Sequence, residues 1–191
     1  YRLGARRVVC AREMSVAEIA AMRKAIPAAM EIEVFVHGAM CLAISGRCLI
    51  SDYLTGRHAN KWQGVQPCRW EYELKERSRP DQSVGIEEGE DGTYLLNSKD
   101  LNMLAHLDDL AAAGVSSVKI EGRVKKAFYV ATVVNAYRHV LDGEPASLWE
   151  HELEIISHRP YSTGFYSGDA EQTTDHDIHV QLCDWVGDVV S

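Results

Sequence analysis

Three of the five cysteines lie close together in the sequence, at Cys41, Cys48 and Cys68. Thiolates are ligands for zinc and for iron–sulfur clusters. On one unbroken helix, residues seven apart lie about 10 Å apart along the axis, whereas the sulfurs that share one zinc ion lie within about 4.6 Å of each other. Cys41 and Cys48 can therefore share a metal only if the chain turns between them, as Ser45-Gly46 permits. The alternative is that both thiols are small, buried apolar groups.

These cysteines follow a short apolar run that carries two ionisable side chains. Residues 31–37 read EIEVFVH, an alternation that predicts a half-buried β-strand. On such a strand Glu33 and His37 face one way together with Phe35, and the other face is made of Ile32, Val34 and Val36. The aliphatic face suits packing beneath helices, and the face with the ionisable groups suits the interior or mouth of an α/β barrel. We therefore interpret Glu33 and His37 as candidate catalytic residues.

Charged side chains also follow other predicted strands. Lys119 and Glu121 alternate with apolar neighbours in SVKIE, so both face the same side of a strand. A buried Lys–Glu pair is costly unless each group satisfies the other, so the pair either closes the sheet as a salt bridge or lines a substrate site. We take Lys119 and Glu121 as candidate catalytic residues. The candidate substrate-binding cations at the same edge are Arg12, Lys99 and Arg123.

The elements that would position these residues follow a strand–helix rhythm. Strands are predicted at residues 6–12, 31–37, 93–97 and 117–121, and helices at 15–25, 99–113 and 125–141. The first helix should begin with a capping box made by Ser15 and Glu18. Strands that alternate with helices imply an α/β fold with a parallel sheet, and four such units are half of a TIM-type (β/α) barrel.

The rhythm also predicts the domain organisation. We expect the second half of a (β/α) barrel over residues 1–145, with a cysteine-bearing loop at about 38–92. A small β-rich extension should start at 146–191, where 153–156 and 178–182 look like strands. Because the chain enters a predicted strand almost at once, we expect it to be a fragment of a longer protein.

The composition is that of an ordinary globular protein, with 46% hydrophobic and 25% charged residues among 191. The net charge of −8 does not favour a general nucleic-acid binder, although residues 47–79 are locally basic. No run approaches the roughly 18 apolar residues of a transmembrane helix. Five cysteines without the spacing of a disulfide framework predict a reducing, cytoplasmic environment.

Several strings of the sequence resemble peptidase family U32, the collagenase-like peptidases: VHGAMCLAISGRC, QPCRWEY, NSKDL, SVKIEGRVKKAFYVA and HRPYSTGFY. The resemblance covers almost the whole chain and implies a TIM-like barrel followed by a small β-rich extension. It also implies an iron–sulfur cluster on four cysteines. Cys41 and Cys48 match the first two ligand positions, and Cys68 matches a later one. Gly64 and Asn102 stand where many members carry cysteine, so the chain presents three candidate thiolates.

The name of the family implies hydrolysis of collagen-like chains, but the residues give that activity little local support. The sequence has no Gly-x-Ser-x-Gly nucleophile elbow. His151-Glu152 begins like the helix of a zinc protease, but Ile155 stands where the second histidine belongs. Peptidase activity is therefore an alternative that rests on the family name.

The resemblance is greatest to the tRNA-hydroxylation branch of the family, which acts on the wobble uridine with a prephenate-derived hydroxyl. The basic stretch at 47–79 could then contact tRNA phosphates and bases, or it could be an ordinary solvated loop. Prephenate is a dicarboxylate, so Arg12, Lys119 and Arg123 are candidates to hold it. A third possibility is a non-catalytic assembly or binding module. Its partner would be the missing N-terminal half of the barrel or an equivalent chain.

Overall fold

The computed structural model describes residues 1–41, 43–44, 48–57, 65–70, 73–75, 78, 83–85, 97–123 and 125–168. The predicted strands at 93–97 and 178–182 lie outside these residues, apart from position 97, as does much of the basic stretch at 47–79. Among the helices of the described residues, none has the length and apolar character needed to cross a lipid bilayer.

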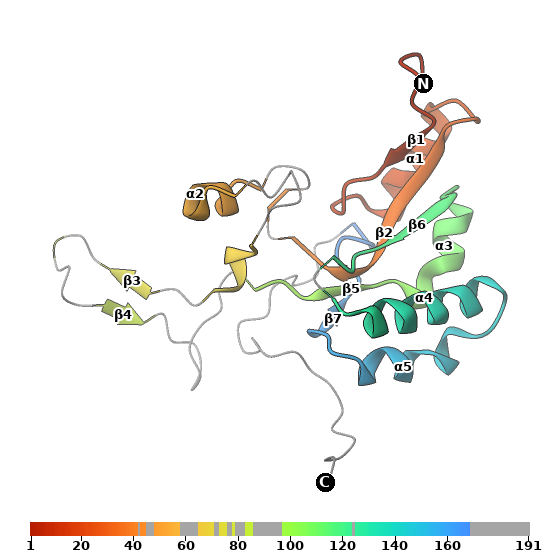
Figure 1. Ribbon diagram of the computed structural model, residues 1–191. Coiled ribbons are helices and arrows are strands. Elements are labelled where there is room, and N and C mark those ends of the chain that lie inside the picture. The colour runs from red at the N-terminus through yellow and green to blue at the C-terminus, as the bar shows by residue number, and fades with distance from the viewer. Residues whose placement is uncertain are drawn as a thin grey trace, which may run out of the picture.

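The described part of the chain is built on a five-stranded sheet (Figure 1). Its strands are β1 (Arg7–Val9), β2 (Glu31–Ala39), β5 (Asp100–Asn102), β6 (Ser117–Ile120) and β7 (Tyr161–Ser162). Strand β2 pairs in parallel with both β1 and β6, as predicted for the strands at 6–12, 31–37 and 117–121. Strand β5 pairs antiparallel with the end of β2 and parallel with β7, which was not predicted. The described sheet is open, and a (β/α) barrel stays a prediction.

Strand β2 has the buried aliphatic face that its sequence predicts. Its aliphatic residues Ile32, Val34 and Val36 belong to the hydrophobic core. The pairing with β6 shifts between Phe35 and His37, however, so the regular alternation is interrupted at a bulge. His37 is buried like its neighbour Val36, whereas strict alternation would place it with the half-buried Glu33 and Phe35.

The first helix, α1 (Val16–Ala25), begins as predicted. The Ser15 hydroxyl accepts a hydrogen bond from the backbone N–H of Glu18 at 3.3 Å, and the Glu18 carboxylate accepts one from the Ser15 N–H at 2.8 Å. This capping box satisfies two backbone donors that have no partner within the helix.

Replacing Ser15 by alanine should therefore destabilise the protein by about 1 kcal/mol, because the Glu18 N–H would lose its acceptor. The midpoint of urea-induced unfolding measures this change. Ser15→Thr keeps a hydroxyl at the same place and is expected to recover most of the loss.

The predicted helix at 99–113 is wrong in its first half. The structure has β5 at 100–102, a 3₁₀ helix at Leu104–His106 and then α3 (Leu107–Ala112). The apolar residues that suggested a helix are nevertheless all buried: Leu101, Leu104, Leu107 and Leu110. The side chain of Asp100 is completely buried and bonded to residues far along the chain, so tertiary contacts override the local periodicity here.

The remaining helices pack on each other beside the sheet. Helix α4 (Ala127–Leu141) matches the prediction at 125–141, and α5 (Glu150–Ile155) lies next to it, after a 3₁₀ helix at Ala146–Leu148 (Figure 1). The strand predicted at 153–156 is therefore wrong. Leu153 and Ile156 are buried, as they would be in a strand. A short apolar run in the sequence does not distinguish a buried helix from a buried strand.

The cysteine-bearing segment forms small elements of its own, which Figure 1 shows to one side of the five-stranded sheet. They are α2 (Ile50–Thr55), a 3₁₀ helix at Pro67–Arg69, and the antiparallel pair β3 (Glu73–Lys75) and β4 (Ser83–Gly85).

Candidate functional site

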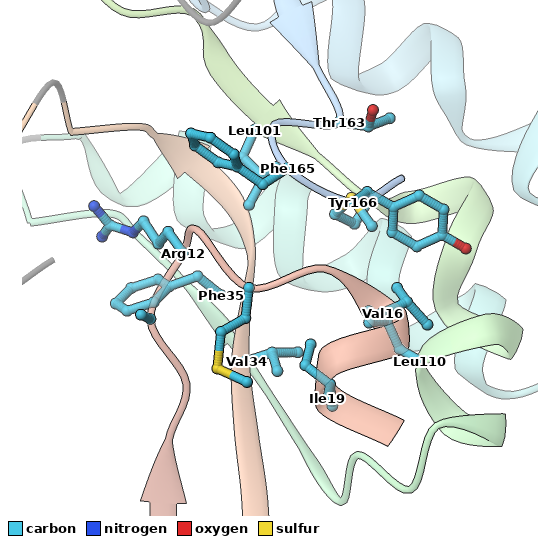
Figure 2. Close-up of a pocket in the computed structure, with 13 residues that line it drawn as sticks. Arg12, Val16, Ile19, Val34, Phe35, Leu101, Leu110, Thr163, Phe165 and Tyr166 are labelled. Atoms are coloured by element: carbon cyan, nitrogen blue, oxygen red, sulfur yellow. The ribbon is translucent and has the colours of Figure 1, made fainter. Parts of the chain in front are cut away.

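Two cations from different strands flank the ring of Phe35. The guanidinium carbon of Arg12, which follows β1, lies 3.9 Å from the ring centroid, and Nζ of Lys119 in β6 lies 5.1 Å from it. Figure 2 shows the Arg12 side chain beside this ring. Cations are attracted to the face of an aromatic ring within about 6 Å, so Phe35 holds both charges in place.

Two carboxylates balance these cations, but not in the pairing that the sequence predicts. Lys119 lies 3.6 Å from the carboxylate of Glu33, and Arg12 lies 3.7 Å from that of Glu121. The predicted Lys119–Glu121 pair is thus replaced by two pairs, one between β6 and β2 and the other between the segments that follow β1 and β6. We call Arg12, Glu33, Phe35, Lys119 and Glu121 the strand-end cluster.

Neighbouring groups in this cluster stabilise the charged forms of Glu33 and Arg12. Burial alone would raise the pKa of Glu33, but the hydrogen bond from Ser117 and the charges of Lys119 and Arg7 outweigh it and lower that pKa. Burial lowers the pKa of Arg12, and the nearby carboxylate of Glu121 opposes that effect. The lowered pKa of Glu33 keeps its carboxylate charged at neutral pH, and an arginine stays charged in proteins.

Of the other two predicted substrate-binding cations, Arg123 contacts the cluster, and Lys99 is hydrogen-bonded to a residue outside it. Arg123 is exposed, and its backbone N–H donates to the carboxylate of Glu121 at 2.9 Å. Lys99 is half-buried before β5, where its carbonyl accepts a hydrogen bond from the N–H of Met40. Gly122 serves packing, because a Cβ there would lie 2.7 Å from a methyl group of Val130.

A small pocket opens between Phe35 and the segment after β7 (Figure 2). Its lining includes Arg12, Phe35, Leu101, Phe165 and Tyr166. The volume of about 30 Å³ suits a water molecule and is far smaller than a nucleobase. The pocket can therefore accept a small group at the edge of the strand-end cluster, but not a nucleoside.

His37 does not join the strand-end cluster, so the structure does not bring it together with Glu33. Its ring packs against Tyr129, Tyr137 and Tyr161, with centroids 6.1, 5.5 and 5.4 Å away. Burial is the main cause that lowers the pKa of His37 to about 4, and the charge of Asp100 opposes it. The imidazole is therefore neutral at physiological pH.

A buried ion pair that the sequence did not reveal lies close to His37. Arg159 donates to the carboxylate of Asp100 at 2.5 Å, and its other terminal nitrogen donates to Asn97 at 3.1 Å and to Ser98 at 3.3 Å. Lys125 adds a second cation 4.0 Å from the same carboxylate. These bonds tie the segment HRPYSTGFY to the segment NSKDL, two of the strings that carry the family resemblance.

Two of the three predicted metal ligands are brought together. The side chains of Cys41 and Cys48 are hydrogen-bonded, and burial raises the pKa of the Cys41 thiol, which disfavours the thiolate that a metal needs. Cys68 lies in the 3₁₀ helix at 67–69, and within the part of the chain that the structure describes none of the three forms a disulfide. Among the described residues no group of three or more His, Cys, Asp or Glu side chains could hold a metal ion. The described residues therefore do not make up a four-thiolate site, and an iron–sulfur cluster stays a prediction.

The chain belongs to peptidase family U32, whose family model matches residues 1–176. It is 37% identical over 209 residues to the tRNA hydroxylation protein P of Escherichia coli, covering 86% of this chain and 46% of that protein. It is 42% identical over 143 residues to an Escherichia coli 23S rRNA 5-hydroxycytidine synthase, covering 74% of this chain and 20% of that protein.

A third relative carries the peptidase name. The chain is 30% identical over 178 residues to a collagenase of Porphyromonas gingivalis, covering 84% of this chain and 42% of that protein. The chain spans about half the length of the tRNA hydroxylation proteins that it matches. No solved structure matches it.

Proposed function

We propose that this chain is part of a cytoplasmic protein that hydroxylates the wobble uridine of tRNA with a prephenate-derived hydroxyl. The relatives named for tRNA and rRNA hydroxylation support RNA as the substrate. The proposal that the substrate is a small dicarboxylate rests on the strand-end cluster. There Arg12, which follows β1, and Lys119 of β6 both lie on the ring of Phe35 in β2, the strand that pairs with β1 and with β6.

The geometry of this cluster suits a dicarboxylate. Its two ion pairs have N–O distances of 3.6 and 3.7 Å, longer than the roughly 2.8 Å of a charge-assisted hydrogen bond. An incoming carboxylate can therefore compete with Glu33 for Lys119, and another can compete with Glu121 for Arg12. On this proposal the two acidic residues keep both cations oriented before the substrate binds.

The proposal is tested in cells that lack the full-length gene and carry a variant copy. We expect Arg12→Gln and Lys119→Met each to reduce the 5-hydroxylated wobble uridine of tRNA at least tenfold, as measured by mass spectrometry of nucleosides. Arg138→Gln is the matched control, because it removes an exposed cation that is paired with Asp142 outside the cluster. It should leave the modification unchanged.

The amount of folded protein must be measured in the same cells. Normal modification in both cluster variants at normal protein levels would refute the proposed role of the cluster. Normal modification in the gene deletion would refute the proposed function itself. Cleavage of gelatin by the purified protein would instead support the peptidase reading.

A further inference from the structure

Two buried polar atoms near β2 and α4 have no hydrogen-bond partner among the described residues. They are Nε2 of His37 and the hydroxyl oxygen of Tyr129. The two residues are only 1% and 5% exposed, and their ring centroids are 6.1 Å apart. An unpaired polar group in a protein interior is costly, so two of them on neighbouring rings require an explanation.

The hydrogen bonds of Tyr137 fix the tautomer of His37. The single proton of the Tyr137 hydroxyl is donated to the carbonyl of Val36 at 2.8 Å, and the same oxygen accepts the N–H of Met103 at 3.1 Å. Nδ1 of His37 lies 3.3 Å from this oxygen, so this nitrogen must be the donor of that bond. In a neutral imidazole that is protonated at Nδ1, Nε2 carries only a lone pair.

The two unpartnered atoms are therefore complementary. Nε2 of His37 can only accept a hydrogen bond, and the Tyr129 hydroxyl has a proton to donate. A hydroxyl group both donates and accepts, so it satisfies the two atoms at once. We propose that His37 and Tyr129 bind one hydroxyl group between them, which belongs either to a water molecule or to an alcohol of the substrate.

The surroundings place this hydroxyl-binding pair next to the strand-end cluster. The backbone N–H of Glu121 donates to the carbonyl of His37 at 2.9 Å, so the main chains of the two sites are joined at this point. On the other side, Nζ of Lys125 lies 4.6 Å from the ring centroid of Tyr129 and faces the carboxylate of Asp100. If the bound hydroxyl belongs to water, the proposal requires no further assumption. If it belongs to the substrate, the proposal rests on the proposed function and implies a dicarboxylate that carries a hydroxyl group.

The sign of a stability change tests whether Tyr129 has a partner. If its hydroxyl is bound, Tyr129→Phe removes a hydrogen bond and should lower the midpoint of urea-induced unfolding of the complete protein. If its hydroxyl is unpaired, Tyr129→Phe replaces a buried polar group by an apolar one and should leave the midpoint unchanged or raise it, which would overturn the proposal. Tyr53→Phe is the control, because Tyr53 is 87% exposed and should show no shift.

Nuclear magnetic resonance of the ¹⁵N-labelled imidazoles identifies the bound group, and on the unmutated protein it does not depend on the folding of a variant. We expect His37 to be protonated at Nδ1, with an Nε2 resonance shifted toward that of a hydrogen-bonded nitrogen. A cross-peak between water and the His37 ring protons, seen without added ligand, assigns the hydroxyl to water. Its loss on addition of prephenate assigns the site to the substrate hydroxyl.

These outcomes test the hydroxyl-binding pair independently of the proposed function. A water cross-peak that survives prephenate supports the hydroxyl-binding pair with water as its occupant, and the tRNA nucleoside experiment then decides the function independently. If neither water nor prephenate affects the His37 ring, the Tyr129 hydroxyl bonds directly to Nε2 or to nothing, and the proposal is overturned. Protonation of His37 at Nε2 in place of Nδ1 would overturn it as well.

Discussion

Gly38→Ala is expected to reduce the free energy of unfolding by about 3 kcal/mol or more. Gly38 has a φ of +101°, where a side chain costs about 1–2 kcal/mol. An added Cβ would also lie 2.5 Å from the backbone oxygen of Glu121, closer than any van der Waals contact allows. This oxygen cannot move away easily, because the N–H of the same residue is bonded to the carbonyl of His37. Overpacking of this kind adds about 1–3 kcal/mol.

Gly143 provides the matched control for this substitution. It has the same φ of +101°, but a Cβ built there meets nothing within 4 Å. Gly143→Ala should therefore cost only the backbone term, and the difference between the two variants in urea-induced unfolding measures the close contact between β2 and Glu121. Equal losses in both variants would show that the strand ends adjust to the added methyl group.

The parts of the fold that the sequence predicts are those set by local periodicity and capping. The alternation in β2 buries Ile32, Val34 and Val36 as expected, and Ser15 and Glu18 cap α1 as expected. In each case the deciding interactions lie within a few residues of each other or depend only on which face is apolar. The parallel pairing of β1, β2 and β6 follows from the same strand–helix rhythm.

The parts that the sequence does not predict depend on contacts between distant residues. Strand β5 replaces the first turns of a predicted helix because Asp100 is bonded to Arg159, 59 residues away. Helix α5 was predicted as a strand because Leu153 and Ile156 are apolar in either structure. Nothing in the local pattern shows which distant element such residues will meet.

The sequence indicates which charged residues lie in the strand-end cluster better than it indicates which of them form ion pairs. Arg12, Lys119 and the two acidic residues do meet at the strand ends, but each cation pairs across strands. Strand alternation places side chains on a face, and it does not say which neighbour on that face lies nearer. The bulge between Phe35 and His37 is also invisible in the sequence, and it separates His37 from the cluster.

Arg159→Met is expected to destabilise the protein by about 3–5 kcal/mol, because it leaves a carboxylate in the interior without its main partner. Asp100 is 0% exposed, and its bond from Arg159 is 2.5 Å long. Lys125 remains 4.0 Å from that carboxylate, so the loss should fall toward the lower end of this range. The unfolding free energy from urea titration gives the value.

The double variant Asp100→Asn with Arg159→Met tests the cause of this loss. Removing both charges leaves no carboxylate in the interior, and Lys125 keeps its hydrogen bond to the carbonyl of Ser157 at 2.9 Å, so the double variant should be more stable than Arg159→Met alone. If it is less stable, the unpaired carboxylate is not the cause of the loss in Arg159→Met, and the hydrogen bonds of Arg159 to Asn97 and Ser98 and the pairing of Lys125 with Asp100 account for it.

An exposed ion pair on α4 shows how much of the effect is due to burial. Arg138 donates to Asp142 at 2.6 Å, nearly the same distance as in the Arg159–Asp100 pair, but both side chains are more than half exposed. Water and salt compensate charges at the surface, so Arg138→Met should cause no clear change in stability. The two pairs have the same chemistry and almost the same distance. If only Arg159→Met lowers the free energy of unfolding strongly, the cause is therefore the buried carboxylate that is left without its cation. A comparable loss in Arg138→Met would refute that explanation.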